Sequence, residues 1–455
     1  MLTYELKKGP GVPLYEALYR CIRGDILSGK LNPGQKLPSK RTLSANLKVS
    51  KITVETAYNQ LLSEGYIRAE EKVGYFVEAV TRLAPKTIPP LTLPEKEEDL
   101  IDLTANGPAK FPFSVWSRLQ REVLLDMGGQ LLTPLDNQGL PQLRQAIAEH
   151  LGQFRGMGVD PENILIGAGT DFLYNLLVQL LGRDKCYAVE DPGYGKIRKI
   201  YAAAGADCIS VPMDKRGVVP SALDRAQVLH ISPAHHFPTG LVTPLTRRQE
   251  LLSWVKAQPG RYIIEDDYDS EFRFSAHPMP TLQSMAGGEQ VIYMNTFSKS
   301  LAPSIRISYM VLPAGLMAVY REKLGFYSCT VPSFQQHTLA RFIQRGHFEK
   351  HLNRMRKFYR SQRNRVLEAL SSCPVREKLT VQEENAGLHF LVKAALPLTD
   401  AELVEVCRKA GLRVQTLGEF YHSAVPAWAR GQLVVNYSGL TEEDLQKLEQ
   451  KLRDL

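Results

Sequence analysis

The sequence predicts a two-domain protein of the α/β class, in which a small helical domain precedes a large domain with a mostly parallel sheet. Its 455 residues exceed the size of one ordinary domain. A stretch with four prolines and a charged run interrupts the chain at 78–99, and short apolar runs alternate with helical stretches after it. We therefore assign residues 1–77 to the small domain, 78–99 to a linker and 100–455 to the large domain.

The small domain is predicted to contain three helices and a two-stranded wing. Apolar residues recur at helical spacing over residues 14–26, and the pattern ends near Gly29. A second short helix begins after Pro38, and Ser50 is placed to cap a third. The inward face of the third helix is formed by Val54, Ala57, Tyr58, Leu61 and Leu62. A hairpin follows, with the strands Tyr66–Arg68 and Tyr75–Val77 and a turn through Gly74.

The large domain alternates strand-like and helical segments. Five short apolar runs are the predicted strands: Ile164–Ile166, Cys186–Val189, Val228–Ile231, Arg261–Ile264 and Val291–Met294. Helical stretches separate them, one of which starts at Asp171. Such alternation indicates a sheet that helices cover on both faces. After the basic helix Arg354–Arg365, the rest of the chain is predicted to form a smaller α+β unit.

Composition excludes several classes of protein. With 44% hydrophobic and 23% charged residues, the chain has the profile of a globular protein. The six cysteines are scattered without a CxxC pair or a nearby histidine, which favours reduced core thiols and no metal site. The N-terminus has no apolar signal core, and no apolar run approaches the ~20 residues that span a bilayer. We therefore expect a cytoplasmic protein without membrane contact.

Positive charge is concentrated at the N-terminus. The formal net charge is +8, and residues 1–77 hold 12 Lys and Arg against 7 Asp and Glu. This excess favours a polyanionic partner for the small domain. A solvated basic face is the alternative interpretation.

The second and third predicted helices have the order of a helix-turn-helix, whose second helix enters the major groove with its N-terminal residues nearest the bases. Lys51 can donate to a phosphate or a guanine edge, and Ser50 and Thr53 are short donors suited to the DNA backbone. Arg41 lies on the preceding helix, and Gly74 lies where a wing could approach the minor groove. A generic helical capping domain is the alternative.

The small domain also resembles a known family. The runs Pro33–Ser44, Val49–Val54 and Leu61–Ile67 are similar to the GntR family of winged-helix regulators, and the likeness covers nearly all of residues 10–77. The resemblance implies operator DNA as the partner.

The large domain carries the side chains that a pyridoxal phosphate (PLP) site requires. Such a site needs a lysine for the Schiff base, a carboxylate facing the pyridine nitrogen and a basic, hydroxyl-rich phosphate cradle. Lys299 follows a predicted strand and is the candidate Schiff-base residue. Thr296, Ser298 and Arg306 would hold the phosphate. Asp266, at the end of another strand, would face the pyridine nitrogen.

Further residues are expected around the same cofactor. Tyr268 could reach the ring oxygen, and Tyr194 could stack on the ring. Gly169 and Thr170 open a helix whose backbone N–H groups suit an anion. We expect His235, rather than its neighbour His236, to contact the ring oxygen. Asp267 and Asp269 are expected to be structural or to face solvent.

Together these segments resemble the fold type I aminotransferases from about Ile101 to the C-terminus. Joined to a GntR-type domain, they make the chain similar to the MocR/GabR regulators, a likeness that Phe111–Trp116 and His235–Gly240 support. The resemblance implies a head-to-tail, domain-swapped homodimer whose PLP sites are shared between subunits. It also implies a small-molecule effector.

The sequence departs from the aminotransferases in the pocket. Val434 stands where the pattern Arg-x-Asn-Phe/Tyr-Ser places the arginine that grips a substrate carboxylate. Glu419 stands where the GABA-sensing members have another arginine, so the effector is expected to be an amine or amino acid, a cation among them, or PLP itself. Lys196 or Arg198 could still bind a carboxylate. We expect a sensor with at most residual transaminase activity; a working aminotransferase and a PLP-free dimerisation domain are the alternatives.

Overall fold

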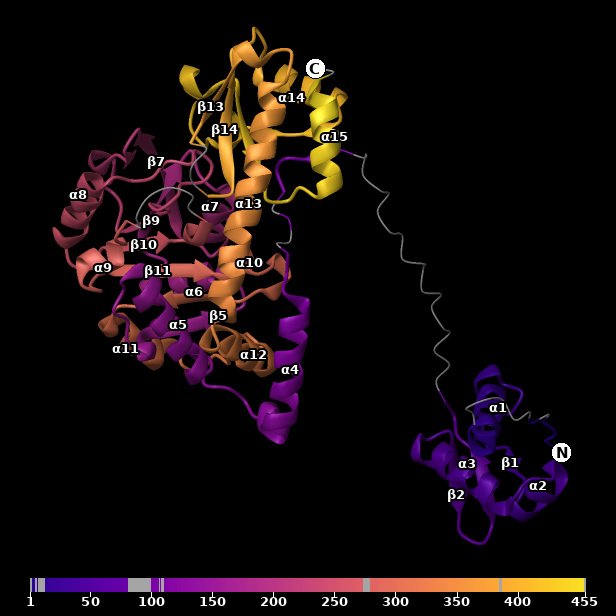
Figure 1. The fold of residues 1–455 in the computed structure, drawn as a ribbon. Helices are drawn as coiled ribbons and strands as arrows, with labels where there is room; N and C mark the ends of the chain where they lie inside the picture. Colours follow the sequence, from indigo (N-terminus) through magenta and orange to yellow (C-terminus); the bar gives the residue numbers. More distant parts are fainter. Residues whose placement is uncertain are drawn as a thin grey trace. The chain divides into compact units, whose positions relative to one another are not determined.

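The chain folds into two compact units, Met1–Lys96 and Glu97–Leu455 (Figure 1). The computed structural model describes residues 2–4, 6, 13–80, 100–105, 107, 110–272, 279–383 and 387–453. Residues 81–99 of the expected linker lie outside the described residues. Each unit has its own hydrophobic core, and the units are described separately below.

The N-terminal unit holds three helices and a small antiparallel sheet. The helices are α1 (Leu14–Ser28), α2 (Lys40–Leu47) and α3 (Lys51–Ser63). The strands β1 (Lys36–Leu37), β2 (Ile67–Glu70) and β3 (Gly74–Val77) pair in the order β1-β3-β2. The sequence predicted a two-stranded wing, and the structure adds a third strand, β1, from the segment between α1 and α2. Two residues were too short a run to show strand alternation in the sequence.

Serine caps fix where the second and third helices begin. The hydroxyls of Ser39 and Ser50 accept the N–H groups of Thr42 and Thr53, at 3.1 Å in both cases. Gly29, in a left-handed conformation, ends α1 as predicted. The inward residues of the three helices form one core with Ile67 and Val77 of the sheet.

The larger unit is built on a mixed sheet in the order β5-β12-β11-β10-β9-β6-β7-β8, counted over the described residues. Its strands are β5 (Ile164–Gly167), β6 (Cys186–Asp191), β7 (Asp207–Asp214), β8 (Gly217–Val218), β9 (Val228–Ile231), β10 (Tyr262–Asp266), β11 (Val291–Thr296) and β12 (Ser308–Val311). The central run from β11 to β7 is parallel. β12 is antiparallel to both β11 and β5, and β8 to β7. The sheet is thus parallel at its centre and antiparallel toward its ends.

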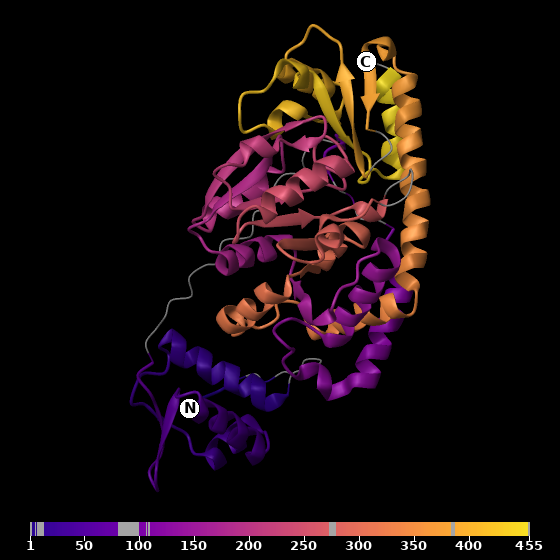
Figure 2. The ribbon, with the colours of Figure 1, turned by 90° about the vertical axis from the view of Figure 1, so that its left-hand side faces the viewer.

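Helices cover both faces of this sheet (Figures 1 and 2). α6 (Thr170–Leu181), α7 (Gly195–Ala203) and α11 (Ala314–Leu324) pack on one face. α5 (Pro141–Arg155), α12 (Ser333–Gln344), α8 (Leu245–Lys256) and α9 (Leu282–Ala286) pack on the other. Alternate strand residues supply the two cores: Leu165 and Ile264 face the first set of helices, and Ile166 and Ile263 face the second.

A smaller α+β part completes the unit, as predicted. The antiparallel sheet β13-β14-β17-β16 contains Leu379–Gln382, His389–Ala394, Gln432–Asn436 and Gln415–Thr416, in that order. α14 (Asp400–Lys409), α15 (Glu442–Arg453) and the parallel pair β4 (Ile101–Asp102) and β15 (Leu412–Arg413) accompany it. The long helix α13 (His347–Ser371) runs beside both sheets, and α4 (Phe113–Met127) packs on α12 (Figure 2). The short α10 (Phe297–Ser300) follows β11.

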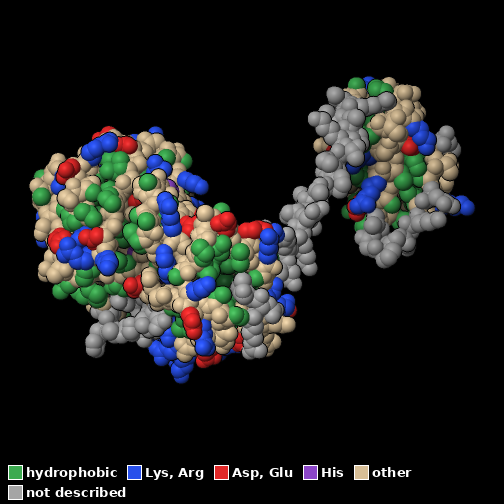
Figure 3. All heavy atoms as spheres, turned by 90° about the horizontal axis from the view of Figure 1, so that it is seen from above, with side chains coloured by type: hydrophobic (Ala, Val, Ile, Leu, Met, Phe, Trp, Pro, Cys, Tyr) green, Lys and Arg blue, Asp and Glu red, His purple; other side chains and the backbone are tan. Residues whose placement is uncertain are grey.

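The charged side chains and the cysteines lie as the composition predicts: charges of both signs are on the surface, and the thiols are free. Figure 3 shows Lys and Arg side chains among acidic ones on both units. All six cysteines are free, and three of them are buried. Within the described ranges, the helices include none that combines the length and the hydropathy needed to traverse a lipid bilayer.

Candidate functional site

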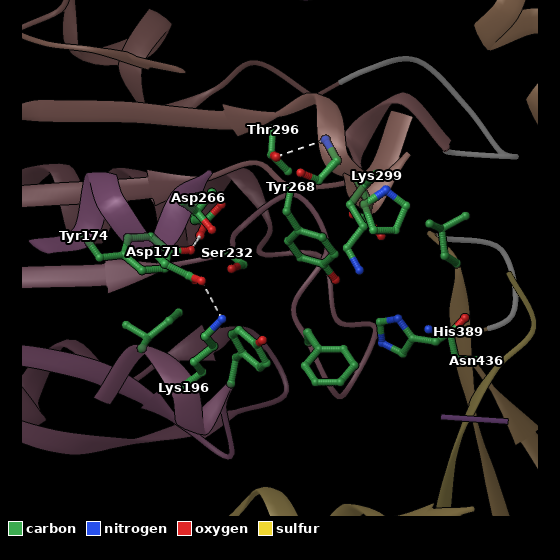
Figure 4. Close-up of a pocket in the computed structure, with 18 of the residues that line it drawn as sticks. Asp171, Tyr174, Lys196, Ser232, Asp266, Tyr268, Thr296, Lys299, His389 and Asn436 are labelled. Carbon is green, nitrogen blue, oxygen red and sulfur yellow. Dashed lines mark hydrogen bonds and ion pairs between the residues drawn. The ribbon is translucent and has the colours of Figure 1, made fainter. Parts of the chain in front are cut away.

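A cavity of about 400 Å³ lies in the larger unit where the parallel strands end. Its walls come from the carboxyl ends of β6, β9, β10 and β11, the first turn of α6, and the strands β14 and β17 of the smaller sheet (Figure 4). Ligands of open α/β sheets bind at this edge. The predicted residues Thr170, Tyr194, Lys196, Asp266, Tyr268, Thr296, Ser298, Lys299 and Arg306 all line the cavity.

Lys299 is the central amine of the cavity. It sits on α10 directly after β11, and in Figure 4 it points into the space beside Tyr268. Burial lowers the pKa of Lys299 to about 8, although the nearby carboxylates of Asp269 and Asp266 act to raise it. At pH 7 roughly a tenth of the Lys299 side chains are therefore neutral amines, far more than for an ordinary lysine. The neutral amine is the form that attacks carbonyl groups.

Asp266 presents one carboxylate oxygen to the cavity and binds the protein with the other. Tyr174 donates a short hydrogen bond to Oδ2, and His230 Nε2 lies 3.4 Å from the same oxygen. Tyr201 holds the far side of that imidazole, with its hydroxyl 2.6 Å from Nδ1. Asp266 Oδ1 is buried and meets no partner among the described residues. A buried carboxylate oxygen without a donor is suited to a protonated ring nitrogen.

The other end of the cavity is basic and opens at the start of α6. Arg306 Nη2 lies 3.4 Å from Asp171 Oδ2, and Lys196 Nζ lies 2.6 Å from the same oxygen. The guanidinium also packs on Gly169, where a Cβ would lie 2.4 Å from Nη2. Arg306 itself adopts a left-handed backbone with φ of 49°, a strained conformation for a non-glycine residue. Two cations and the N-terminus of α6, with Thr170 as its first residue, thus surround one small volume.

The two predicted hydroxyls differ in their availability. Thr296 is the N-cap of α10: its hydroxyl accepts the Ser298 N–H at 3.1 Å and pairs with Ser308 Oγ at 2.8 Å. Ser298 Oγ is buried and finds no hydrogen-bond partner in the part of the chain described. The Ser298 hydroxyl is thus the one left open to a ligand, whereas the Thr296 hydroxyl already shapes the turn.

His235 does not line the cavity, contrary to the expectation that it touches the ring oxygen. It is buried behind the wall, where Nδ1 lies 2.8 Å from Asp269 Oδ2 and 3.3 Å from the Tyr268 hydroxyl. Gly387 closes over its ring: a Cβ there would lie 1.8 Å from Cε1. Asp269, expected to be structural or exposed, is buried, lines the cavity and orients this histidine. His236 bonds to the turn through Thr239 Oγ1 at 2.7 Å.

The same region brings together a group that sequence spacing did not reveal. His235, Asp269 and His389 come from three distant segments, and their ligand atoms lie within 4.8 Å of one another. Such a set could hold a metal ion. The His235–Asp269 hydrogen bond joins two of these groups without one. Burial lowers the pKa of His389, and the charges of His235, His236 and Lys299 act in the same direction, so His389 is a neutral imidazole that needs no ion to balance it.

Aromatic side chains form the remaining wall. Tyr194 is the N-cap of α7 and is 48% exposed at the mouth of the cavity. Its ring stands edge-on to Phe237 with centroids 6.0 Å apart, and Phe237 in turn contacts His389 at 5.1 Å. Tyr194 is thus placed to cover a planar ligand, in keeping with its expected role.

Glu190 is a cavity residue that sequence reasoning missed. It is the penultimate residue of β6, and its carboxyl accepts the Ser232 N–H at 3.0 Å. Burial raises the pKa of Glu190 to about 8. The side chain is therefore largely protonated at neutral pH and can donate a hydrogen bond into the cavity.

Two residues expected to read the effector lie elsewhere. Glu419 is exposed, and its carboxylate accepts the Thr416 N–H at 2.8 Å as part of a capping box. Arg198 is exposed on α7 and does not line the cavity. Of the three residues expected to read the effector, only Lys196 lines the cavity. Val434 is 3% exposed within the apolar cluster of Leu391, Leu417 and Ala429, and its side chain does not line the cavity.

The predicted DNA-reading residues lie at the start of α3 and on α2. Arg41, Ser50 and Lys51 are exposed, and Thr53 is partly exposed. Gly74 is not at the wing tip as expected: it begins β3 opposite Glu70, and residues 71–73 form the turn. The sequence did not place the turn at residues 71–73, because Glu71 and Lys72 carry no strong turn signal.

The missed residues differ in the signal that the sequence offered. Tyr174 and Tyr201 lie inside helices, where an aromatic residue most often signals only a core position. His230 could have been noticed as a polar residue inside the apolar strand β9, and Glu190 as a carboxylate at a strand end.

The comparisons with known proteins agree with this geometry. Residues 98–452 match the family model described as aminotransferase class I and II, and residues 14–77 match bacterial regulatory proteins of the gntR family. The structure of kynurenine aminotransferase from Pyrococcus horikoshii superposes with a TM-score of 0.68 at 24% identity, over 79% of this chain and 92% of that one. This likeness shows the fold.

Relatives match over both units at once. The HTH-type transcriptional regulator YdeL of Bacillus subtilis is 37% identical over 99% of this chain and 98% of its own length. The HTH-type pyridoxine biosynthesis transcriptional regulator PdxR of Corynebacterium glutamicum is 32% identical over 88% of this chain and 87% of its own length. The probable rhizopine catabolism regulatory protein MocR of Rhizobium meliloti is 29% identical over 97% and 93%. The chain therefore belongs to the family of HTH-type transcriptional regulators that join a GntR-type DNA-binding domain to an aminotransferase class I and II domain.

Proposed function

We propose that this chain is a PLP-dependent transcription regulator that binds operator DNA with its N-terminal unit and senses a small molecule at Lys299. The observation that carries the proposal is the pairing of a cavity lined by Lys299, Asp266 and Arg306 with a buried Val434. The pocket can hold PLP, but the position that grips an amino-acid carboxylate in transaminases is closed inside an apolar cluster.

The residues present fit PLP, the cofactor of the aminotransferase class I and II fold. Bound PLP would supply an aldehyde that joins covalently to amines and a ring that withdraws electrons. Lys299 Nζ would attach it, and the unpartnered Asp266 Oδ1 would hold the proton of the ring nitrogen. The phosphate would lie against Arg306, Ser298 and the N-terminus of α6. Tyr194 would cover the ring and exclude water from it.

The effector we propose is an amine or amino acid, or PLP itself. Besides Lys299, the described cations that line the cavity are Lys196 and Arg306, and both pair with Asp171 at the phosphate end. The described residues at the opposite end, beside His389 and Asn436, therefore include no carboxylate clamp. The name of the Corynebacterium relative ties that protein to pyridoxine biosynthesis, which supports a vitamin B6 compound as one candidate. A cytoplasmic homodimer with exchanged DNA-binding units and shared PLP sites is part of this proposal.

A working aminotransferase is the second candidate, because Lys299, Asp266 and Arg306 are all in place. Only interactions that position the substrate separate the two functions. Turnover of an amino donor and a keto acid by the purified, PLP-loaded chain would favour the enzyme. We expect none beyond a residual rate.

The decisive experiment measures DNA affinity against cofactor occupancy. Duplexes that the full chain binds are selected from a random-sequence pool, and fluorescence anisotropy then gives the affinity with and without PLP and candidate amines. Lys299→Ala should abolish the visible absorption of covalently held PLP and the response to it. Lys51→Ala should weaken DNA binding and lower its salt dependence by about one ion. If neither PLP nor any amine changes the DNA affinity, the proposal that the chain is a sensor is wrong.

A further inference from the structure

Ile52 is the most exposed large apolar side chain in the described part of the N-terminal unit. It leaves 73% of its surface exposed, against 50% for Val73 and 36% for Leu27. A single exposed apolar residue is common and means nothing by itself. What distinguishes Ile52 is its place, because it is the second residue of α3 and follows the N-cap Ser50 by two positions.

The polar side chains around Ile52 are already engaged within the unit. The Ser50 and Thr53 hydroxyls lie 2.8 Å apart, and the former also caps the helix. Glu55 pairs with Lys40 at 2.6 Å. Thr56 donates its hydroxyl to the Ile52 carbonyl at 2.9 Å. The first turn of α3 therefore offers mainly the exposed side chains of Lys51 and Ile52 to a partner.

The major groove of DNA presents one apolar group that such a residue can recognise. Thymine carries a C5-methyl group there, and no other base does. In a helix-turn-helix the N-terminal residues of the second helix lie nearest the base edges. A branched aliphatic side chain in the first turn can bury that methyl without competing for hydrogen bonds, while the neighbouring lysine binds a phosphate or a guanine edge.

We propose that Ile52 is a specificity-determining residue that contacts the methyl group of a thymine in each operator half-site. The inference rests on the proposed function, since it requires that α3 enters DNA. It assigns Ile52 a role separate from the phosphate and guanine contacts expected of Ser50, Lys51 and Thr53. The operator should accordingly contain one thymine per recognition helix whose methyl group is read.

The test removes one methyl group at a time. In a duplex selected by the PLP-loaded full chain, each thymine is replaced in turn by deoxyuridine, which lacks only that methyl. At one thymine per half-site the wild-type affinity should fall about fourfold, the factor expected when one methyl group is no longer buried. Ile52→Ala should bind the thymine and deoxyuridine duplexes equally at that position. Ile52→Val should keep most of the discrimination.

The matched control is Val73→Ala, which trims an exposed apolar side chain on the wing turn. The Val73→Ala variant should keep the wild-type discrimination at every thymine. The thymine methyl group lies in the major groove, whereas the wing is expected to approach the minor groove. If Ile52→Ala discriminates as the wild type does at every position, Ile52 is not the reader. If the wild-type chain selects no duplex at all, the proposed function is wrong, and the proposed contact of Ile52 with thymine is then wrong as well.

Discussion

At the scale of single residues, the burial of the Lys299 amine should determine how the rate of PLP attachment depends on pH. Burial lowers its pKa to about 8 from the ordinary 10.5, so the neutral amine becomes the major form above about pH 8. The rate of covalent attachment of PLP to the PLP-free protein should therefore rise about tenfold per pH unit below pH 8 and level off above it. Stopped-flow absorbance over about pH 6 to 10 measures this. A rate that climbs unabated toward the top of that range would mean an ordinary lysine.

The raised pKa of Glu190 should make the stability of the protein depend on pH. Its folded pKa of about 8 lies above the ordinary value of 4.5, so the folded chain keeps a proton that the unfolded chain has lost. Its contribution to stability is therefore present at low pH, declines as the pH rises from about 4.5, and is lost once the pH passes about 8. Glu190→Gln keeps the shape of the protonated form and does not titrate. Its free energy of unfolding should gain on the wild type by at most about 1.4 kcal/mol per pH unit in that window.

Chemical denaturation at several pH values, with the PLP-free protein throughout, checks this difference. A matched control is Glu149→Gln, because Glu149 lies exposed on α5. That variant should show a stability difference that hardly changes with pH. A Glu190→Gln profile parallel to the wild type would show that the Glu190 carboxyl ionises in the folded protein as it does in the unfolded chain.

Residue chemistry was predictable where a reactive side chain follows a strand. Lys299, Asp266 and Tyr268 each lie within five residues of the end of an apolar run. All three line one cavity. His235 was misplaced because two adjacent histidines in a turn do not reveal which way either points. Contacts made across the fold, such as Tyr174 to Asp266, join residues 92 positions apart and leave no local pattern.

At the scale of the element, the N-cap of α3 ties folding to DNA binding. Ser50 satisfies the Thr53 N–H, so Ser50→Ala should cost about 1 kcal/mol of local stability. Ser50→Asp should restore the cap, because a carboxylate accepts the same bond and suits the positive helix end. It should still weaken DNA binding through repulsion of phosphates. Hydrogen exchange of the α3 amides and DNA affinity, measured on both variants, separate the two effects.

Ser39→Ala serves as the control, since it removes the same kind of cap from α2. Faster exchange should then be confined to α2. If Ser50→Asp binds DNA as tightly as the wild type, the start of α3 does not approach the phosphates.

Elements were predictable where the sequence shows apolar periodicity, a cap or a buried apolar run. α1, α2 and α3 begin and end close to the positions expected from apolar spacing and caps. The strands β1, β7, β8 and β12 were not foreseen, although β7 spans eight residues. β12 begins three residues after the short helix η5 (Pro303–Ile305), and only its pairing with β5 and β11 shows its direction. Strand direction depends on the partner and not on the strand's own sequence.

At the scale of the whole molecule, the two units must communicate if the chain is a sensor. The alternation of apolar runs predicted the α/β architecture of the larger unit, and the proline-rich segment predicted that the chain divides. How one unit influences the other depends on assembly and DNA geometry, which no local pattern encodes. Thermodynamic linkage nevertheless constrains the outcome, because coupling between two binding sites is reciprocal.

That reciprocity gives the strictest test of sensing. If PLP or an amine changes operator affinity by some factor, saturating operator DNA must change the affinity of that ligand by the same factor, typically about 5- to 150-fold. Cofactor absorbance titrations with and without the selected duplex give one factor, and anisotropy titrations with and without ligand give the other. A duplex of scrambled sequence should leave ligand affinity unchanged, and Lys51→Ala should need more DNA to produce the same shift. Two factors that both equal one would leave the pocket and the DNA-binding unit uncoupled, and the chain would then have to be a transaminase or an assembly domain instead.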